Sequence, residues 1–314
     1  MRGALVTGAA GFVGRHMLAE LVRRGWDALG VDLRRGHRLN GGTLLELDAR
    51  DVFAGHRCPG ERFDLVVHCA YHVGGRVSID GNPSLLALNL ELDARMFDWA
   101  VRTGQGAVMY LSSSAVYPIS LQRGGPQPSL AECMIDSGGL QPDARYGWAK
   151  LTGERLATAA TEQGLRVHVL RPFSGYGGDQ DDCYPFPAIA KRVMGGDMTV
   201  WGPPGQTRDW IHIDDVVAGA LAVHDADYRD PVNLCTGVGT EFGTLATMMA
   251  REAGIEVGPV DPRGRSDGVT YREDRPTGVL CRVGDPTRML DLYTPTIALD
   301  EGIRRVLSEV ATRS

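Results

Sequence analysis

The chain of 314 residues contains very little lysine and no paired cysteine motif. Lys150 and Lys191 are the only lysines among 33 basic residues, and the net charge of −6 predicts no general attraction to nucleic acid or anionic membranes. The six cysteines are scattered, without the C-x-x-C spacing of zinc or redox sites. No apolar run is long enough to span a membrane. We therefore expect reduced thiols, no metal site, no nucleic-acid partner and no membrane partner.

The remaining composition is that of an ordinary globular protein. Apolar residues make up 43% of the chain and charged residues 23%, and the length allows a full hydrophobic core. The first residues lead directly into an apolar run, which leaves no room for a signal peptide. We therefore expect a cytoplasmic protein of one large domain or two.

The N-terminal stretch predicts a nucleotide site. Residues 4–6 form a short apolar run that stops before Gly8, and apolar residues recur at helical spacing from Phe12 onward. Gly8, Gly11 and Gly14 form a G-x-x-G-x-x-G pattern between this strand and this helix. Such a turn would direct the N–H groups of a helix N-terminus at a pyrophosphate. The context favours a dinucleotide site over an ordinary strand-to-helix turn.

A carboxylate follows the next apolar run, which covers residues 28–31. Asp32 lies close to the distance from the glycines that is expected for the group that binds an adenosine ribose. A carboxylate there would repel a 2′-phosphate, which favours NAD over NADP. Arg34 and Arg35 follow immediately and could accommodate that phosphate, so that NADP stays an alternative.

Strand-like and helix-like stretches alternate along the chain, which predicts an α/β protein with a parallel sheet. Further strands are expected at residues 44–47, 63–70, 107–111 and 167–170, and helices at 85–101, 145–162 and 300–307. The stretch 71–75 would pass beside the cofactor at the carboxyl edge of the sheet. Residues 124–139 are rich in glycine, proline and serine, and we expect a surface loop there.

Tyr146-Gly-Trp-Ala-Lys150 is the strongest chemical signal in the sequence. Residues four apart share one face of a helix, so the phenol and the ammonium would lie together. A phenol has an ordinary pKa of about 10, and a neighbouring ammonium should lower it toward neutral pH. The three serines at 112–114 follow a predicted strand, and this context favours catalysis over an amphipathic surface pair.

Together these motifs resemble the extended short-chain dehydrogenase/reductase superfamily. By this resemblance, Val116-Tyr117 identifies Ser113 as the serine that would hydrogen-bond the substrate oxygen, and leaves Ser112 and Ser114 as backbone caps. Arg171-Pro-Phe-Ser-Gly-Tyr-Gly177 and Gln206-Thr-Arg-Asp-Trp-Ile-His-Ile-Asp-Asp215 are similar to motifs of its NAD-dependent nucleotide-sugar epimerases and dehydratases. The resemblance covers nearly the whole chain.

The resemblance implies a Rossmann-type doubly wound parallel sheet with a smaller, mixed α/β C-terminal substrate domain. From Arg171 onward, prolines and glycines crowd the chain and the alternation of strands and helices becomes irregular. We therefore predict a NAD-binding domain at residues 1–170, with returning segments near 209–235, and a nucleotide-sugar-binding domain at 171–314.

Three sets of site residues are implied. Proton transfer would use Ser113, Tyr146 and Lys150. The cofactor, NAD, would contact the glycine turn and the carboxyl ends of the strands, through Gly8, Gly11, Phe12, Val13, Gly14, Asp32, Asp48, Ala70, Asn89, Tyr146 and Lys150. The nucleotide-diphosphate sugar would contact a third set, in which two arginines bind phosphate, namely Ser114, Ser174, Arg192 and Arg208.

Departures from the family motifs limit the reaction. Sugar 4,6-dehydratases carry Asp-Glu after the catalytic threonine, where this chain has Ser114-Ala115. GDP-mannose 3,5-epimerases and GDP-fucose synthases carry a cysteine at the position of Ala115, and the fucose synthases also carry a histidine at that of Tyr184. Cys183 could substitute for that cysteine. The remaining groups suffice for hydride transfer at one carbinol carbon.

We therefore predict a NAD-dependent nucleotide-sugar epimerase that acts at C4 through a transient 4-keto sugar. Tyr146 would take the hydroxyl proton, Ser113 would hold the sugar oxygen, and Lys150 would bind the nicotinamide ribose. A nucleotide-sugar ketoreductase or dehydrogenase would use the same residues and is the first alternative. A non-catalytic NAD-binding module is the second, although such chains usually lose the tyrosine or the lysine.

The resemblance also implies a homodimer. The helices at 85–101 and 146–162 are those that the superfamily often pairs across a two-fold axis, the commonest symmetry of oligomers. Met96 and Leu156 are candidate contacts, and both would equally suit an intramolecular core.

Overall fold

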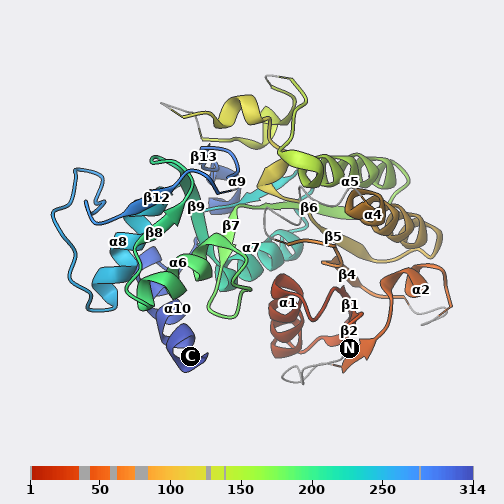
Figure 1. The fold of residues 1–314 in the computed structure, drawn as a ribbon. Helices are drawn as coiled ribbons and strands as arrows, with labels where there is room; N and C mark the ends of the chain where they lie inside the picture. Colours follow the sequence, from red (N-terminus) through yellow and green to blue (C-terminus); the bar gives the residue numbers. More distant parts are fainter. Residues whose placement is uncertain are drawn as a thin grey trace.

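A parallel sheet of seven strands forms the centre of the larger part of the molecule (Figure 1). The computed structural model describes residues 2–34, 43–56, 62–74, 84–124, 129–137, 139–275 and 277–313. The strands follow the order β10-β6-β5-β4-β1-β2-β3. Their bounds are β1 Gly3–Thr7, β2 Asp27–Asp32, β3 Thr43–Glu46, β4 Leu65–His68, β5 Ala107–Leu111, β6 Arg166–Pro172 and β10 Val232–Leu234. The predicted doubly wound Rossmann-type sheet is confirmed.

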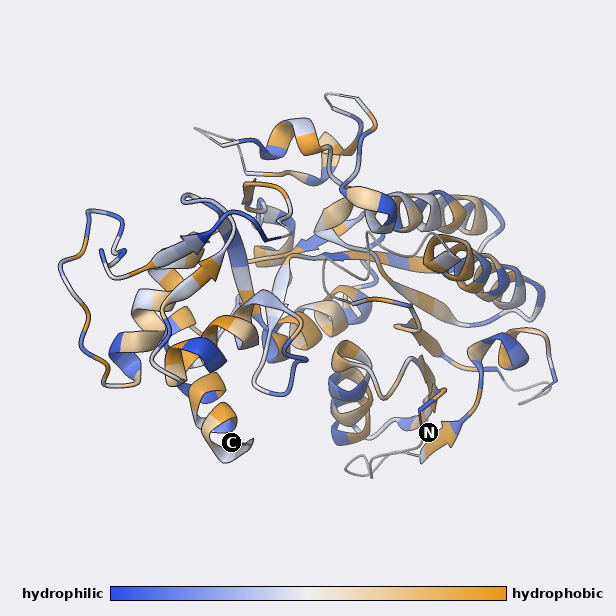
Figure 2. Ribbon diagram, in the orientation of Figure 1, coloured by the Kyte–Doolittle hydropathy of each residue, from blue (hydrophilic) through white to orange (hydrophobic). Residues whose placement is uncertain are grey.

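Helices cover both faces of this sheet. On one face lie α1 (Phe12–Arg23) and α7 (Ile213–Asp225), and on the other lie α2 (Ala49–Phe53), α4 (Ser84–Arg102) and α5 (Ala144–Glu162). Side chains along a strand alternate between faces, so Ala4 and Val6 enter one apolar core and Leu5 the other. Figure 2 shows apolar residues along the central strands. Both faces are covered, which explains why these strands read as continuous apolar runs.

A smaller mixed sheet forms the second part of the molecule. At its centre, β9 (Thr207–His212) pairs in parallel with β7 (Ser174–Tyr176) and β13 (Cys281–Arg282), and antiparallel with β11 (Gly239–Glu241). A separate parallel pair consists of β8 (Thr199–Trp201) and β12 (Thr270–Arg272). A third apolar core lies among α6 (Pro185–Met194), α8 (Phe242–Glu252) and α10 (Leu299–Arg313). The expected mixed α/β C-terminal region is confirmed.

The chain crosses between the two sheets more than once. β10 pairs with β6 of the large sheet, and the short α9 (Thr287–Leu290) packs against β10. α7 packs against α1, whereas β9 belongs to the small sheet. Of the returning segments expected near residues 209–235, α7 and β10 pack on or pair with the large sheet, and β9 contributes Ile211 to its core while it pairs within the small sheet. The division into domains at residue 170 stays a prediction.

The surface loop expected at 124–139 is partly exposed and partly buried where the structure describes it, and it contains a short 3-10 helix, Glu132–Asp136. Residues 125–128 and 138 lie outside the described residues. Leu130 and Glu132 are buried. Asn233, in β10, donates from its backbone N to Glu132 Oε1 and from Nδ2 to Leu130 O, both at 2.8 Å. These two bonds attach the buried part of the segment to β10.

Two further expectations concern surfaces. Met96 is fully buried in the core between the sheet and α4, so it is no dimer contact. Leu156 is partly buried against the same core. None of the helices in the described ranges combines the length and the apolar character of a membrane span.

A buried ion pair joins β6 to α5 at the carboxyl edge of the large sheet. Arg171 donates from Nε and Nη2 to the Glu154 carboxylate at 2.9 and 2.8 Å, and both side chains are buried. Ser112 Oγ donates to the same carboxylate, and Arg171 Nη1 donates to Tyr117 Oη at 3.1 Å. This two-pronged geometry compensates charges that would be costly to bury alone.

Glu154→Gln should lower the free energy of unfolding by about 3–5 kcal/mol, because it leaves the Arg171 charge buried without its partner. Urea denaturation measures this loss. Glu162→Gln, at the exposed end of the same helix, is the matched control and should change stability by less than about 0.5 kcal/mol. Equal losses in the two variants would contradict the importance of the buried pair.

Candidate active site

The predicted site residues gather at the carboxyl edge of the large sheet. β1, β2, β4 and β5 are parallel, so their carboxyl ends lie at one edge. Thr7, the last residue of β1, is the register partner of Val31 and of His68. The glycine turn follows Thr7, and the serines follow Leu111 at the end of β5. The nucleotide turn and the catalytic serine predicted from sequence therefore share this edge.

The turn after β1 fits a dinucleotide pyrophosphate. α1 begins after Gly11 without a side-chain cap and without an acidic residue in its first turn, which contains Phe12 and Val13. Gly8 has a φ of 67°, and a Cβ there would lie 2.6 Å from the backbone N of Ala70. A Cβ at Gly14 would lie 2.1 Å from Gly8 O. Glycine is required at both positions, and the contacts of this turn with NAD stay predictions.

Asp32 is anchored beside the glycine turn. Its Oδ2 accepts from Ala10 N at 3.0 Å, and its Oδ1 accepts from Arg34 N at 2.9 Å and Arg34 Nε at 3.3 Å. The Asp32 carboxylate is buried, whereas the Arg34 side chain is 67% exposed. Arg35 lies outside the described residues. The Asp32 carboxylate would favour a free ribose hydroxyl, and the adjacent exposed Arg34 guanidinium would favour a 2′-phosphate.

Three other residues expected to contact NAD organise the backbone around this edge. Asp48 caps α2 by accepting from Arg50 N at 2.9 Å, and its carboxylate pairs with the Arg50 guanidinium. Ala70 N donates to Thr7 Oγ1, at the end of β1, at 3.2 Å. Asn89, buried in α4, accepts from His72 N at 2.7 Å and donates to His72 O at 3.0 Å. These bonds fix the chain after β4, and direct NAD contacts stay predictions.

Ser113 itself makes the backbone cap that was expected of its neighbours. Its Oγ accepts from Ala115 N at 3.1 Å at the start of a 3-10 turn, and its hydroxyl acts to lower the pKa of the nearby Tyr146 phenol. Ser112 Oγ instead donates to the Glu154 carboxylate in α5. Ser114 is buried, and its contact with a sugar stays a prediction. The Ser113–Tyr146 pair therefore joins the end of β5 to α5.

Tyr146 and Lys150 lie on one face of α5, but the expected lowering of the phenol pKa is not seen. Burial raises the pKa of Tyr146 to about 12, against the hydrogen bond with Ser113 and the charge of Arg282. Burial lowers the pKa of Lys150 to about 8. The spacing predicted the proximity of the two groups, whereas desolvation reverses the expected direction for the phenol.

Tyr71 explains where the ammonium is directed, and no motif singled it out. The centre of its ring lies 3.3 Å from Lys150 Nζ and 5.8 Å from the centre of the Tyr146 ring, which meets it edge-on. Lys150 therefore faces an aromatic ring in the structure. Only the position of Tyr71, directly after the strand expected at 63–70, could have indicated it; Gly75, at the end of that stretch, lies outside the described residues.

The two arginines expected to bind phosphate lie on different elements. Arg208, in β9, donates to its own strand's backbone at 2.8 Å and lies over the Phe242 ring, 5.4 Å from its centre. Arg192, in α6, donates from Nε to the backbone of β8 at 2.8 Å and lies 5.3 Å from the centre of the Trp201 ring. Trp201 is 44% exposed, and Arg275 lies over the same ring. Ser174 begins β7 of the same small sheet as Arg208.

Arg282 is the neighbour of Arg208 in the small sheet. The two are register partners on β13 and β9. Arg282 forms an ion pair at 2.7 Å with Asp143, which directly precedes α5. The positive charge of Arg282 acts to lower the pKa of Tyr146, which burial raises. A single arginine in a chain so rich in arginine carries no sequence signal. The site therefore has a second cation on its substrate side that sequence motifs did not indicate.

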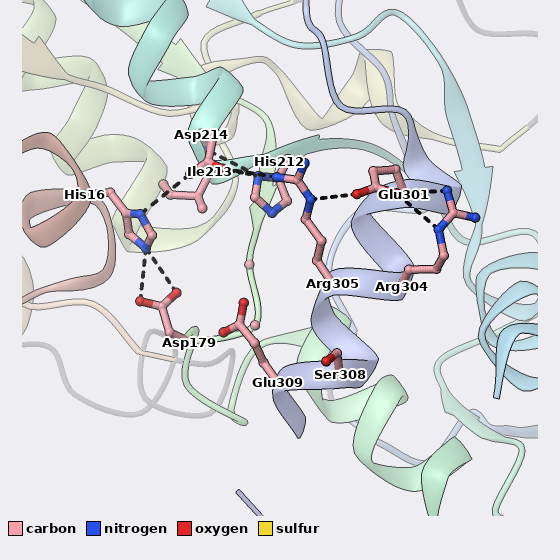
Figure 3. A pocket seen from close by; sticks show the side chains of 12 residues that line it. His16, Asp179, His212, Ile213, Asp214, Glu301, Arg304, Arg305, Ser308 and Glu309 are labelled. Atoms are coloured by element: carbon pink, nitrogen blue, oxygen red, sulfur yellow. Dashed lines mark hydrogen bonds and ion pairs between the residues drawn. The ribbon is translucent and has the colours of Figure 1, made fainter. Parts of the chain in front are cut away.

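A cavity of about 640 Å³ lies between α1 and α10, among residues that do not include Ser113, Tyr146 or Lys150 (Figure 3). His16 Nε2 lies 3.0 Å from Asp179 Oδ2, and Arg305 Nη1 lies 3.4 Å from Asp214 Oδ2. The lining also contains Glu301, Arg304 and Glu309, so acidic and basic side chains both line this cavity. It belongs to the junction between α1 and the C-terminal helix.

Comparisons with known proteins identify the family. The model of the NAD dependent epimerase/dehydratase family matches residues 4–235. The chain is 29% identical to a dTDP-4-dehydro-6-deoxy-D-allose reductase of Streptomyces sp, over 99% of this chain and 95% of the relative. Among solved structures, MoeE5 in complex with UDP-glucuronic acid and NAD has a TM-score of 0.80 at 26% identity, covering 99% and 100% of the two chains. UDP-glucose 4-epimerase from Thermotoga maritima, with UDP-glucose, has a TM-score of 0.81 at 24% identity, covering 99% of each chain.

The chain belongs to the NAD-dependent epimerase/dehydratase family. It is an enzyme of a family of nucleotide-sugar epimerases, dehydratases and reductases, and the expected superfamily and the expected cofactor, NAD, are confirmed. The family includes several reactions and sugars, and the residues of the site are the basis for choosing among them.

The protein should bind NAD more tightly than NADP, because Asp32 would accept a hydrogen bond from a free ribose hydroxyl. Repulsion of about 1–4 kcal/mol between like charges about 4 Å apart gives a preference of roughly five-fold or more. Calorimetric titration with each cofactor measures the ratio. Asp32→Asn should reduce the preference, whereas Arg34→Ala should weaken NADP and leave NAD nearly unchanged. Tighter binding of NADP by the unaltered protein would show that Arg34 dominates.

Proposed function

We propose that the protein transfers hydride at C4 of a nucleoside-diphosphate sugar, as a C4 epimerase that works through a transient 4-keto sugar. The observation that carries this proposal is the position of Tyr146 near Ser113 at the carboxyl edge of the sheet, one helical turn from Lys150. The adjacent Ser114 and Ala115 are buried, and neither supplies the carboxylate acid and base of a dehydratase. The site therefore suits proton and hydride transfer at a single carbon.

Each side chain has a defined task in this proposal. Tyr146 would take the C4 hydroxyl proton and return it. Ser113 accepts from Ala115 N, which leaves its hydroxyl proton for the sugar oxygen. Lys150 would hold the ribose of the cofactor. NAD, held at the glycine turn and by Lys150, would supply the hydride acceptor when bound.

The small sheet would hold the rest of the substrate. Arg208 and Arg282 are register partners, and guanidinium groups suit the paired oxygens of a diphosphate. Arg282 is also paired with Asp143, so its position relative to α5 is fixed. A diphosphate bound there would place the attached sugar on the Tyr146 side of Arg282.

A 4-ketoreductase is the second candidate, and the 29% identity to the allose reductase over 99% of the chain favours it. The same groups would then work in one direction, with Tyr146 giving its proton to the keto oxygen. Reduced cofactor would be consumed in proportion to product. The two candidates therefore differ in turnover of the cofactor and share the residues around C4.

Incubation with UDP-, dTDP- and GDP-hexoses and with their 4-keto derivatives separates the candidates. An epimerase interconverts C4 epimers with no net change in the absorbance of reduced nicotinamide. A ketoreductase oxidises one equivalent of reduced cofactor for each ketone reduced. Absence of both reactions with every sugar nucleotide would contradict the proposal.

Tyr146→Phe should lower turnover by about 10²–10⁴-fold, because it removes the acid/base group and keeps the ring that packs against Tyr71. Fold and NAD binding, checked by circular dichroism and calorimetry, should be unchanged. Tyr228→Phe, a partly buried tyrosine on the opposite side of β6, is the matched control and should turn over normally. Near-normal turnover of Tyr146→Phe would refute the assigned chemistry.

We also propose that α4 and α5 pair in a two-fold homodimer. Trp148, on the outer face of α5, is 44% exposed, an unusual position for so large an apolar ring. Trp148→Glu should convert the dimer to monomer in sedimentation velocity at micromolar concentration. Leu290→Glu, at another exposed apolar residue, is the control and should leave the dimer intact. A monomeric unaltered protein would contradict this assembly.

A further inference from the structure

A carboxylate that no motif predicts lies buried close to Lys150. Asp93, in the middle of α4, has no exposed surface. Tyr110 Oη donates to Asp93 Oδ2 at 2.7 Å, and His68 Nε2 lies 3.3 Å from Asp93 Oδ1. Tyr110 and His68 belong to the neighbouring strands β5 and β4, where they are register partners. The three side chains meet on the face of the sheet that α4 and α5 cover.

α5 lies directly on this pair. A Cβ added to Gly153 would lie 1.8 Å from Tyr110 Oη and 2.6 Å from Asp93 Oδ2. Gly153 follows Lys150 by three residues and therefore lies on the same side of the helix. The helix that carries the catalytic pair is thus held against the Tyr110–Asp93 hydrogen bond.

The ammonium of Lys150 lies between two aromatic rings. Its Nζ is 3.3 Å from the centre of the Tyr71 ring and 5.0 Å from that of Tyr110, and Lys150 is 3% exposed. Aromatic faces attract a cation, more strongly where water is excluded. Burial lowers the pKa of Lys150 to about 8, and Asp93 is the largest of the charges that oppose this effect.

Asp93 differs from the other nearby carboxylate, Glu154, in having no arginine partner among the described residues. Glu154 is paired with Arg171 at 2.8 Å, so that cation largely offsets its charge. Asp93 is instead hydrogen-bonded by a phenol and faced by an imidazole. No arginine among the described residues therefore offsets the charge of Asp93 as Arg171 offsets that of Glu154.

Thr7 contacts the other nitrogen of the His68 ring. Thr7 Oγ1 accepts from Ala70 N at 3.2 Å and lies 2.9 Å from His68 Nδ1. Asp93 Oδ2 accepts from the Tyr110 phenol, whereas Oδ1 has no hydrogen-bond partner among the described residues.

We propose that Asp93 is a positioning residue that keeps the buried ammonium of Lys150 charged, together with the aromatic faces of Tyr71 and Tyr110. Without this charge, Lys150 would lose its proton in a dry site and could no longer serve Tyr146 or a ribose. The titratable groups around Lys150 and Asp93 come from β4 and the residues after it, from α4, from β5 and from α5. They are His68, Cys69, Tyr71, Asp93, Tyr110, Tyr146 and Glu154.

The inference rests on the proposed function only for its consequence in catalysis, because the charge of Lys150 can be measured without turnover. The chain has two lysines, so protein labelled with ¹³C-lysine gives side-chain signals from Lys150 and Lys191 alone. The shift of each ε-carbon follows the protonation of its ammonium. Lys191 is exposed and paired with Asp182 at 2.7 Å, which makes it the internal reference.

Asp93→Asn keeps the size of the side chain and an acceptor for Tyr110. It should lower the apparent pKa of Lys150 by about 1–3 units, the effect of removing a nearby opposite charge, and leave Lys191 unchanged. Asp98→Asn, on the exposed face of the same helix, is the matched control and should move neither lysine.

An unchanged Lys150 titration in Asp93→Asn would overturn the proposal, even if turnover were lost, since that pattern assigns Asp93 a purely structural role. If Asp93→Asn does not fold, Asp93→Ser removes the charge, leaves a hydroxyl facing Tyr110, and decides the question in the same way. An inactive unaltered protein with the expected lysine shift would refute the proposed function and support this inference.

Discussion

The close approach of α5 to the carboxyl edge of the large sheet is the constraint on which the site depends. A Cβ at Gly147 would lie 2.4 Å from Ala115 O, and one at Gly153 would lie 1.8 Å from Tyr110 Oη, so two glycines allow the helix to touch the sheet at both contacts. The Glu154–Arg171 pair fixes the same helix to β6. This packing brings Tyr146 to Ser113 and buries Lys150 against aromatic rings. The catalytic geometry is therefore a consequence of helix–sheet packing.

The turn that begins α5 depends on the same packing. Ala144, which begins α5, has a φ of 56°, a left-handed conformation that costs a non-glycine residue about 1–2 kcal/mol. Its neighbour Asp143 donates from its backbone N to Ala115 O at 2.8 Å and pairs with Arg282 through its carboxylate, and these bonds hold the strained turn. The Arg282–Asp143 ion pair therefore links the small sheet to the start of α5, the helix that carries Tyr146.

The sequence predicted what depends on local pattern. The glycine turn, the parallel strands and the shared face of Tyr146 and Lys150 follow from spacing along the chain, and all appear in the structure. Asp93 and Arg282 were not predicted, because each reaches the site only when distant elements pack together. The stretch 71–75 was expected beside the cofactor, but the contact of the Tyr71 ring with Lys150 was not predicted. The pKa of Tyr146 was predicted in the wrong direction, because spacing reports a neighbouring charge and says nothing of the burial that outweighs it.

The two candidate reactions share all the chemistry at the edge of the large sheet. Ser113, Tyr146 and Lys150 act on one carbon and one proton whether the hydride returns to the same sugar or reduces a ketone once. The difference must lie in how long the keto sugar and the cofactor stay bound, which is a matter of the groups that hold the nucleotide. The groups proposed to hold the diphosphate, Arg208 and Arg282, both lie in the small sheet. Because Arg282 also acts on the pKa of Tyr146, a substitution of Arg208 is the one that should change the fate of the intermediate without altering the acid/base group.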